Sequence, residues 1–242
     1  MADELQQWFR DRVGADFGIE LTDGQLDQYE AYYRLLVEWN EKMNLTGITE
    51  RGAVYEKHFY DSLTLALIPE ALQAASLADI GAGAGFPSIP FKIAMPAIEV
   101  TIVDSLAKRI RFLQTVVDEL DLQHVRLVHG RAEDIGRLSD HRDRYDLVTA
   151  RAVARLAGLS ELCLPFVKRG GCFVSMKGSD NADEIQESGK AIRLLRSELK
   201  YTRELSLPLE NSARQLIVID KLAATPKEYP RKAGIPLKQP LI

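Results

Sequence analysis

Three glycines stand at alternate positions, Gly81, Gly83 and Gly85, after a short apolar run, and two prolines, Pro87 and Pro90, come where a helix would begin. Glycine accepts positive φ angles and lets a ligand approach the backbone, and proline suits the first turn of a helix. The stretch therefore predicts a loop between a strand and a helix that can hold a ligand. The alternative is a tight turn that only packs the helix against the strand.

The residues beside this loop favour one kind of ligand. A dinucleotide-binding loop has the spacing GxGxxG and faces a pyrophosphate, whereas the spacing here is GxGxG. Asp79, two residues before Gly81, would repel a diphosphate, but a carboxylate there can orient the ammonium group of a methionine-type cofactor. The loop therefore favours S-adenosylmethionine, with Gly81 and Gly83 against the cofactor and Phe86 packed over it.

Two further positions suit an adenosine ligand. Asp104 ends the apolar run 98–104, where a carboxylate can accept hydrogen bonds from both ribose hydroxyls. Ala132 and Glu133 follow the run 125–130, where a backbone N–H and a polar side chain can bind the edge of adenine. Because these elements come in the required order, each after an apolar run, we predict one cofactor site.

Charge is unevenly distributed along a chain whose net charge is −4. Residues 1–78 carry 6 Lys and Arg against 14 Asp and Glu, whereas residues 101–178 carry 13 against 10 and residues 221–242 carry 5 against 1. A basic face can therefore meet a polyanion while the acidic remainder limits indiscriminate binding. Ordinary solvated helix surfaces would explain the same distribution.

Three basic residues follow predicted strands and are the candidates for a catalytic role. Arg151 ends the fourth run, where its guanidinium can bind guanine O6, a phosphate or the carboxylate of the cofactor, or pair with Asp146 at the surface. Arg131 and Lys177 follow the third and fifth runs. We expect both to contact RNA phosphates or the target base, the alternative being solvated strand ends.

Other polar segments are predicted to have supporting roles. The basic run 108–111 and the tail with Lys238 would contact an RNA backbone, and the tail, which has few apolar residues, would order on the RNA. His58 can face the cofactor, but on an amphipathic helix a structural role is the stronger expectation. Asn40 and Asn44 are expected to hydrogen-bond the loop that joins the helical segment to the sheet.

The elements that must position these residues belong to an α/β fold. Seven short β-rich runs alternate with helical segments, at 76–81, 98–104, 125–130, 145–150, 171–178, 201–209 and 214–221. This order predicts a doubly wound, seven-stranded, mostly parallel sheet. Only four residues separate the last two runs, so they should form a hairpin with an antiparallel last strand. That detail is typical of class I S-adenosylmethionine-dependent methyltransferases and not of six-stranded dinucleotide folds.

A helical segment precedes the sheet. Apolar residues at helical spacing predict a helix from Thr22 to Asn44, with Thr22 or Asp23 as its N-cap, and a second helix that stops at Pro69. We expect an N-terminal helical cap at 1–70, a cofactor-binding domain at 71–222 and a basic tail at 223–242.

Composition restricts the compartment and the metal chemistry. The longest apolar runs are shorter than the roughly 20 residues that span a bilayer, and the start lacks a signal-peptide pattern, so we expect a cytoplasmic protein. Cys163 and Cys172 lie in apolar stretches without CxxC spacing, which predicts buried, reduced thiols and no metal site.

The chemistry of the target can also be narrowed. Methylation of an exocyclic amine uses a [DN]PP[YFW] motif and methylation of a ring carbon uses a Pro-Cys pair, but the chain has TARAVA after its fourth predicted strand and no Pro-Cys pair. Guanine N7 carries an in-plane lone pair and no proton, so its methylation needs positioning and desolvation but no general base. The sequence favours such a target.

At this point the chain resembles a known family. The stretches WNEKMNLTGITE, HFYDSL, DIGAGAGFPSIP, VDSLAKRIRFL, RAED, TARAVA, MKG and YPRKAGIP are similar to those of the bacterial small-subunit ribosomal RNA guanine-N7 methyltransferases, also called glucose-inhibited division protein B. The resemblance implies S-adenosylmethionine-dependent methylation of N7 on one guanine in the decoding-region loop of 16S rRNA. It also implies that Arg151 contacts the cofactor.

Two other functions remain as alternatives. A nicotinamide-dependent oxidoreductase would share the carboxylate at Asp104, but Asp79, the loop spacing and the terminal hairpin disfavour it. A non-catalytic RNA-binding module could keep the fold as a scaffold. We expect a monomer whose partner is 16S rRNA or the small ribosomal subunit, with no membrane partner.

Overall fold

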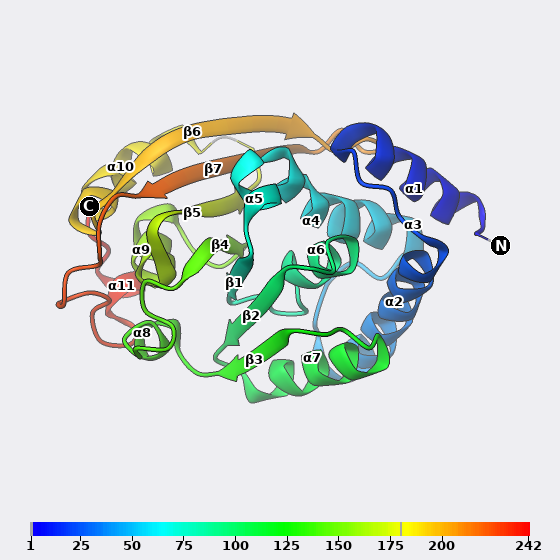
Figure 1. The fold of residues 1–242 in the computed structure, drawn as a ribbon, viewed down its shortest axis with the longest axis horizontal. Helices are drawn as coiled ribbons and strands as arrows, with labels where there is room; N and C mark the ends of the chain where they lie inside the picture. The colour runs from blue at the N-terminus through cyan, green and yellow to red at the C-terminus, as the bar shows by residue number, and fades with distance from the viewer. Residues whose placement is uncertain (1, 180) are drawn as a thin grey trace.

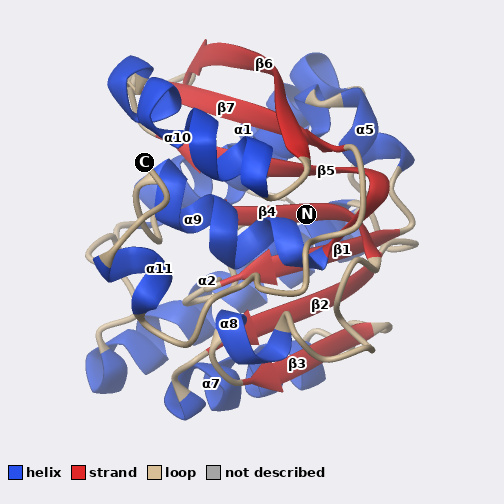
Figure 2. Ribbon diagram, turned by 90° about the vertical axis from the view of Figure 1, so that its left-hand side faces the viewer, coloured by secondary structure: helices blue, strands red, loops and turns tan. Residues whose placement is uncertain are grey.

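The computed structural model describes residues 2–179 and 181–242, which fold around a seven-stranded sheet with helices on both faces (Figure 1). The strand order is β3-β2-β1-β4-β5-β7-β6, and Figure 2 shows the strands stacked in this order. The strands are β1 (Ser76–Ile80), β2 (Glu99–Asp104), β3 (Val125–His129), β4 (Tyr145–Arg151), β5 (Val167–Lys177), β6 (Ser197–Ser206) and β7 (Ala213–Lys221).

The predicted sheet is confirmed. Strands β1 to β5 pair in parallel, whereas β7 runs antiparallel to both of its neighbours, β5 and β6. The predicted terminal hairpin is therefore formed, with β7 inserted between β5 and β6. The run predicted at 201–209 begins earlier, at Ser197, because the first residues of β6 are mostly exposed and polar and carry no apolar pattern.

Helices cover the two faces in two groups. Helices α1 (Glu4–Phe17), α2 (Asp23–Met43), α6 (Ser88–Ala94) and α7 (Ala107–Glu119) lie on one face, and α8 (Ala132–Ile135), α9 (Leu156–Cys163), α10 (Ala182–Leu194) and α11 (Ile235–Lys238) lie on the other (Figure 1). Successive strand residues alternate between two apolar cores, so Leu77 faces the first group and Ala78 the second. No helix in the two described ranges is long and apolar enough to cross a membrane.

The N-terminal helices share their core with the sheet. Phe9 of α1 packs edge-on against Tyr29 of α2, with ring centroids 4.9 Å apart, and both belong to the same apolar cluster as Leu77. The hydroxyls of Tyr29 and Tyr32 donate to the carbonyls of Pro90 and Ala84, at the glycine loop and the helix after it. Helix α2 therefore supports the glycine loop on the side of the first group of helices.

Both predicted helices are present, but the second is irregular. Helix α2 begins after Thr22, whose side chain caps it, and ends at Asn44 in the left-handed region. The segment predicted as a helix ending at Pro69 is helical without a gap from Arg51 to Leu67, but its hydrogen-bond pattern changes along the way, through α3 (Arg51–Val54), a π-helical segment (Tyr55–Tyr60), α4 (Asp61–Leu63) and a 3₁₀ turn (Thr64–Leu67). Pro69 begins the next helix, α5 (Pro69–Gln73), since proline fits the first helical position.

The tail does not behave as predicted. It was expected to order on RNA, but residues 223–242 already lie against the second group of helices. Arg142 donates to the carbonyls of Thr225, Pro226 and Tyr229, and Arg231 pairs with Glu161 of α9. A segment with few apolar side chains is held here by charged hydrogen bonds, which the apolar pattern does not reveal.

Both cysteines are buried free thiols, as predicted. Cys163 lies in the core on one face of the sheet and Cys172 in the core on the other. Burial raises the pKa of Cys172 to about 12, so this thiol is not a nucleophile at neutral pH.

Asp79 lies beneath the glycine loop and does not face a ligand. Its side chain is fully buried, Oδ2 accepts from the backbone N–H of Ser88 at 3.1 Å, and Oδ1 has no hydrogen-bond partner among the described residues. Burial raises the pKa of Asp79 to about 7. The expectation that this carboxylate contacts an ammonium group is therefore not met; it fastens the start of α6 instead.

The raised pKa makes a prediction about stability. The unfolded chain loses the Asp79 proton near pH 4 and the folded chain near pH 7, so the free energy of unfolding falls as pH rises between these values, by up to about 4 kcal/mol. Asp79→Asn keeps an acceptor for the Ser88 N–H but cannot ionise. Urea unfolding at pH 4, 5.5 and 7 should show that the free energy of unfolding declines less with pH in the variant than in the parent protein. An equal decline in both would contradict the raised pKa of Asp79.

Candidate functional site

The glycine loop has the conformation that its sequence predicts. Gly81, Gly83 and Gly85 have φ angles of 76°, 63° and 97°, all in the left-handed region. A Cβ on Gly85 would lie 2.7 Å from Ile89 of α6, and one on Gly81 would lie 3.1 Å from the side chain of Val153. The loop thus needs glycine both for its backbone angles and for its close packing.

A cleft of about 350 Å³ opens where the predicted cofactor residues meet. It brings together five of the predicted site residues, Gly81, Asp104, Arg131, Ala132 and Glu133. The other lining residues are Ile80, Val103, Ser105, Arg109, Gly130, Ala152, Val153, Leu162 and Leu237. These residues follow the carboxyl ends of β1 to β4, with one leucine each from α9 and α11, so the cleft lies where ligands bind in doubly wound sheets.

Asp104 holds the centre of this cleft. Its Oδ1 accepts from the backbone N–H of Leu106 at 2.9 Å, and its Oδ2 accepts from the N–H of Gly83 at 3.1 Å and from Arg109 at 3.3 Å. An ionised carboxylate has about four acceptor positions, so these three contacts leave one free. Arg109 is partly exposed, so the position that it holds can be given up to a ligand. Two hydroxyl groups can therefore be accommodated on Asp104.

Ala132 and Glu133 begin α8, and the structure separates their roles. No described residue accepts from the backbone N–H of either, which leaves both donors available at the cleft. The side chain of Glu133 is buried, and its Oε1 accepts from the N–H of Gly234 at 2.7 Å. The carboxylate therefore anchors the C-terminal segment, a contact that the sequence did not indicate.

Phe86 was predicted to pack over the cofactor, but in the structure it does not line the cleft. It is 5% exposed and stacks on His58 with ring centroids 4.5 Å apart. The guanidinium of Arg151 lies over the same ring, 4.9 Å from its centroid. Phe86 thus joins the glycine loop to the N-terminal helices, because the loop turns this side chain towards the cap face of the sheet.

Arg151 is fixed at the junction of the N-terminal helices and β4. Its Nη1 donates to Asp61 Oδ2 and to the carbonyl of Lys57, both at 3.2 Å. Asp61 also accepts from Nε of Arg214 on β7, at 3.1 Å. The pairing with Asp146 that was considered from the sequence is absent, since Asp146 binds Lys168 and Ser76 instead.

A second cavity, of about 340 Å³, lies beside the first. Ala152 lines both cavities. Its backbone φ angle is 56°, which is unusual for a residue other than glycine. The remaining lining residues are Ile48, Lys57, His58, Asp61, Arg151, Met176, Lys177, Gly178, Arg214 and Leu216. Sequence reasoning missed Asp61 and Arg214; the available signal was a carboxylate inside the otherwise apolar helical run FYDSL.

His58 is uncharged in this setting. Burial, and then the charge of Arg151, lowers its pKa to about 3. Its Nε2 lies 2.8 Å from the hydroxyl of Thr46, and its ring stacks on Phe86. It lines the second cavity and not the first, so it does not face the predicted cofactor site, and its structural role stays a prediction. Asn40, likewise, accepts from the backbone of Leu45 and Thr46 in the turn after α2.

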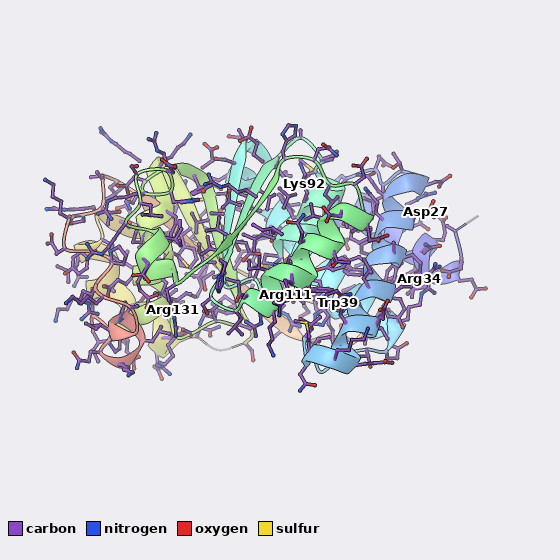
Figure 3. The ribbon with its side chains drawn as sticks, turned by 90° about the horizontal axis from the view of Figure 1, so that it is seen from below. Asp27, Arg34, Trp39, Lys92, Arg111 and Arg131 are labelled. Atoms are coloured by element: carbon purple, nitrogen blue, oxygen red, sulfur yellow. The ribbon has the colours of Figure 1, made fainter. Side chains whose placement is uncertain are left out.

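The two remaining basic candidates differ. Lys177 is mostly buried, and its Nζ donates to Glu184 at 2.7 Å and to the carbonyl of Ala154 at 2.6 Å, so it is not a free cation. Arg131 is exposed at the mouth of the cleft. In Figure 3, which views the molecule from below, Arg131 is labelled beside α8 and Arg111 on α7. Lys108 on the same helix is also exposed.

Two other features carry no assignment. An open hollow of about 580 Å³ lies at the opposite, amino-terminal edge of β2 and β3, remote from the glycine loop. Within residues 2–179 and 181–242, no group of three or more His, Cys, Asp and Glu side chains is placed to hold a metal ion.

Comparison with known proteins identifies relatives over nearly the full chain. "Ribosomal RNA small subunit methyltransferase G" of Bacillus velezensis is 54% identical over 227 residues, which are 94% of this chain and 95% of that protein. The protein of the same name from Brevibacillus brevis is 55% identical over 225 residues, 93% and 94% of the two chains. That from Staphylococcus carnosus is 52% identical over 237 residues, 98% of each chain.

Structural comparison agrees at the level of the fold. The crystal structure of TrmN from Thermus thermophilus has a TM-score of 0.50 and 15% sequence identity, and the match covers 69% of this chain and 53% of that chain. The predicted fold class, that of class I S-adenosylmethionine-dependent methyltransferases, is confirmed. The family model described as "rRNA small subunit methyltransferase G" matches residues 25–216, and the chain therefore belongs to that family.

Proposed function

We propose that this protein transfers a methyl group from S-adenosylmethionine to N7 of a guanine in 16S rRNA. The observation that carries the proposal is the meeting of two cavities at Ala152, one suited to an adenosine cofactor and the other lined by arginines. The family and the printed names of its members support the ribosomal RNA substrate.

The residues of the first cavity fit the cofactor. Asp104 has acceptor positions for the two ribose hydroxyls, and the backbone N–H groups of Ala132 and Glu133 can donate to adenine nitrogens. The backbone at Gly81 lies open to the methionine half. Apolar side chains such as Val103 and Leu162 supply surfaces for the adenine ring. S-adenosylmethionine supplies an electrophilic methyl group on its sulfonium sulfur.

The transfer needs no proton acceptor in the protein. The N7 lone pair forms a bond to the methyl carbon while the carbon–sulfur bond breaks, and that electron pair stays on sulfur. N7 carries no proton, so none has to leave. Asp61 is engaged by two arginines, and the low pKa of His58 keeps it neutral but occupied with Thr46. The chain's contribution is to align two partners and exclude water.

The second cavity is the proposed place for the target base. An enzyme that modifies a base takes it out of its stack into a pocket and reads its edge by hydrogen bonds. Arg151 and Arg214 bring guanidinium groups to this cavity, and guanidinium donors suit guanine O6. Asp61 holds both side chains in place and offsets their charge. Arg151 is the residue that we assign to the target, with the cofactor carboxylate as its other possible partner.

The nicotinamide-dependent oxidoreductase is the less favoured candidate. The antiparallel β7 and the match to the methyltransferase family both speak against it. Nothing in the cleft provides a separate argument for a diphosphate.

The main test is to map the product. Incubation of the protein with methyl-labelled S-adenosylmethionine and small-subunit RNA or particles should place the label on N7 of one guanine. The matched variant Gly81→Asp adds a side chain where even a Cβ is 3.1 Å from Val153, and adds a charge at the methionine end. Calorimetry should find no cofactor binding by the variant. A label on another atom, or equal cofactor affinity, would contradict the proposal.

Arg151 offers a second prediction. Arg151→Ala leaves Asp61 paired with Arg214, so the chain should fold, while the transfer rate should fall about 10²-fold from loss of a charged donor. Cofactor affinity, measured by calorimetry, should change less than about twofold, since Arg151 does not line the first cavity. Arg155→Ala, an exposed arginine paired with Glu187, is the control. A large loss of affinity would move Arg151 to the cofactor.

Arg131 and Lys177 should differ in their effect on RNA binding. Arg131→Ala removes an exposed cation beside the cleft and should reduce the slope of log affinity against log salt by about one unit. Lys177→Ala should leave this slope unchanged, because Lys177 is already neutralised by Glu184. Filter binding over a salt series measures both, and equal slopes for Arg131→Ala and the parent protein would return Arg131 to an ordinary surface role.

A further inference from the structure

The C-terminal segment reaches the cofactor cleft. Helix α11 packs on α9, and Leu237 of α11 is one of the cleft-lining residues. Its side chain is 47% exposed although the helix that carries it is anchored. An apolar side chain held at the mouth of a ligand cleft is a surface that a bound ligand can cover. We call residues 229–238 the strap.

Three contacts fix the strap. Arg231 makes a two-fold ion pair with Glu161, Nε to Oε1 at 3.0 Å and Nη2 to Oε2 at 2.7 Å, and its backbone N–H also donates to Oε1. Glu161 is fully buried. Gly234 donates to the Glu133 side chain at 2.7 Å, so the strap is tied directly to one of the two residues whose backbone N–H groups are the proposed adenine donors. Charged, bidentate pairs of this kind define a geometry closely.

The fit between α11 and α9 leaves no spare space. A Cβ added to Gly158 would lie 2.9 Å from the carbonyl oxygen of Pro236 and 3.0 Å from Cδ2 of Leu237. At Gly158, therefore, α9 and α11 are in close contact. The strap cannot shift towards α9, and its distance from the cleft is set by this contact.

We propose, on the basis of the proposed function, that the strap is the outer wall of the adenine half of the cofactor cleft, with Leu237 packing on the adenine ring. Leu162 of α9 lines the same cleft. Adenine presents an apolar face, and the backbone donors of Ala132 and Glu133 lie at the edge to which the strap is tied. Cofactor affinity then depends on how the strap is docked, although the strap lies outside the glycine loop and the carboxylate motif.

Leu237→Ala tests the wall. Calorimetry on the full-length protein without RNA should find S-adenosylmethionine binding weakened about tenfold or more, because removal of a buried leucine side chain costs most of its transfer free energy. Adenosine, which carries only the half in question, should lose the same factor. The thermal unfolding midpoint without ligand should fall no further than that of Leu222→Ala, since about half of each leucine is exposed. Leu222→Ala, 49% exposed and outside the cleft, is the matched control and should bind normally.

The outcomes separate the strap from the wider proposal. If the parent protein binds neither ligand, the cofactor assignment itself fails. If the parent binds and Leu237→Ala binds as tightly as Leu222→Ala, the strap is not a wall and the proposed function stands. Weaker S-adenosylmethionine binding with unchanged adenosine binding would also overturn the adenine assignment.

Gly158→Ala tests whether docking of the strap matters. Glycine to alanine inside a helix normally stabilises a protein. Here the added methyl has to push α11 outwards, so cofactor affinity should fall severalfold whatever the effect on the unfolding midpoint. Gly189→Ala in α10, where a Cβ meets only the end of a flexible arginine at 3.4 Å, is the control. Equal affinity for Gly158→Ala and the control would show that docking is not coupled to the cleft.

Discussion

The contact of Arg151 with Asp61 is the interaction on which the site depends. Arg151 ends β4, whereas Asp61 belongs to the N-terminal helices, so the ion pair joins two parts of the chain that lie 90 residues apart in sequence. The same guanidinium lies over Phe86 of the glycine loop. One side chain therefore contacts the cap, the loop and the fourth strand at the same time. Without the N-terminal helices, the end of β4 would have no carboxylate to hold its arginine.

Burial makes the pairing of Arg151 with Asp61 necessary. A charged group in a low-dielectric setting has to be paired, and removal of one partner leaves the other uncompensated. Asp61 has two arginines, one from β4 and one from β7, so the carboxylate also fixes the terminal hairpin. Glu56, in the π-helical segment that precedes Asp61, accepts from the backbone at the tip of that hairpin. The irregular helix is thus the place where the cap and the last strands are fastened together.

Much of the fold could be predicted from sequence, because it depends on local patterns. The apolar runs gave the seven strands, the four-residue separation gave the hairpin, and Thr22 with its capping box fixed the start of α2. The π-helical part of the second helix could not be predicted from local patterns, and its residue Glu56 and the residue that follows this part, Asp61, make tertiary contacts with the hairpin and two arginines. The start of β6 was misjudged because its first residues are mostly polar and solvent-facing.

The site was predictable to the extent that its chemistry is carried by motifs. Gly81, Asp104, Ala132 and Glu133 meet in one cleft, as expected from their places after successive strands. Phe86, Asp79 and Lys177 did not take their expected positions, because spacing does not reveal towards which face a loop side chain turns or which acid will neutralise a buried lysine. The strap could not be predicted either, since the residues that anchor it, Glu161 and Glu133, lie 70 and 101 residues away from their partners in sequence.

The proposed reaction, which has no proton acceptor, makes such distant contacts more important. When no acid or base lowers the barrier, the rate depends on how well two reactants are aligned and kept from water, and alignment is sensitive to displacements of about 1 Å. The two cavities share a wall at Ala152, whose positive φ is costly for a residue other than glycine and persists only if the surroundings impose it. Those surroundings are the Arg151–Asp61 pair before it and the packed Val153 after it. Under the proposed function, the strain at Ala152 contributes to the alignment between cofactor and base, because Ala152 forms part of the wall of both cavities.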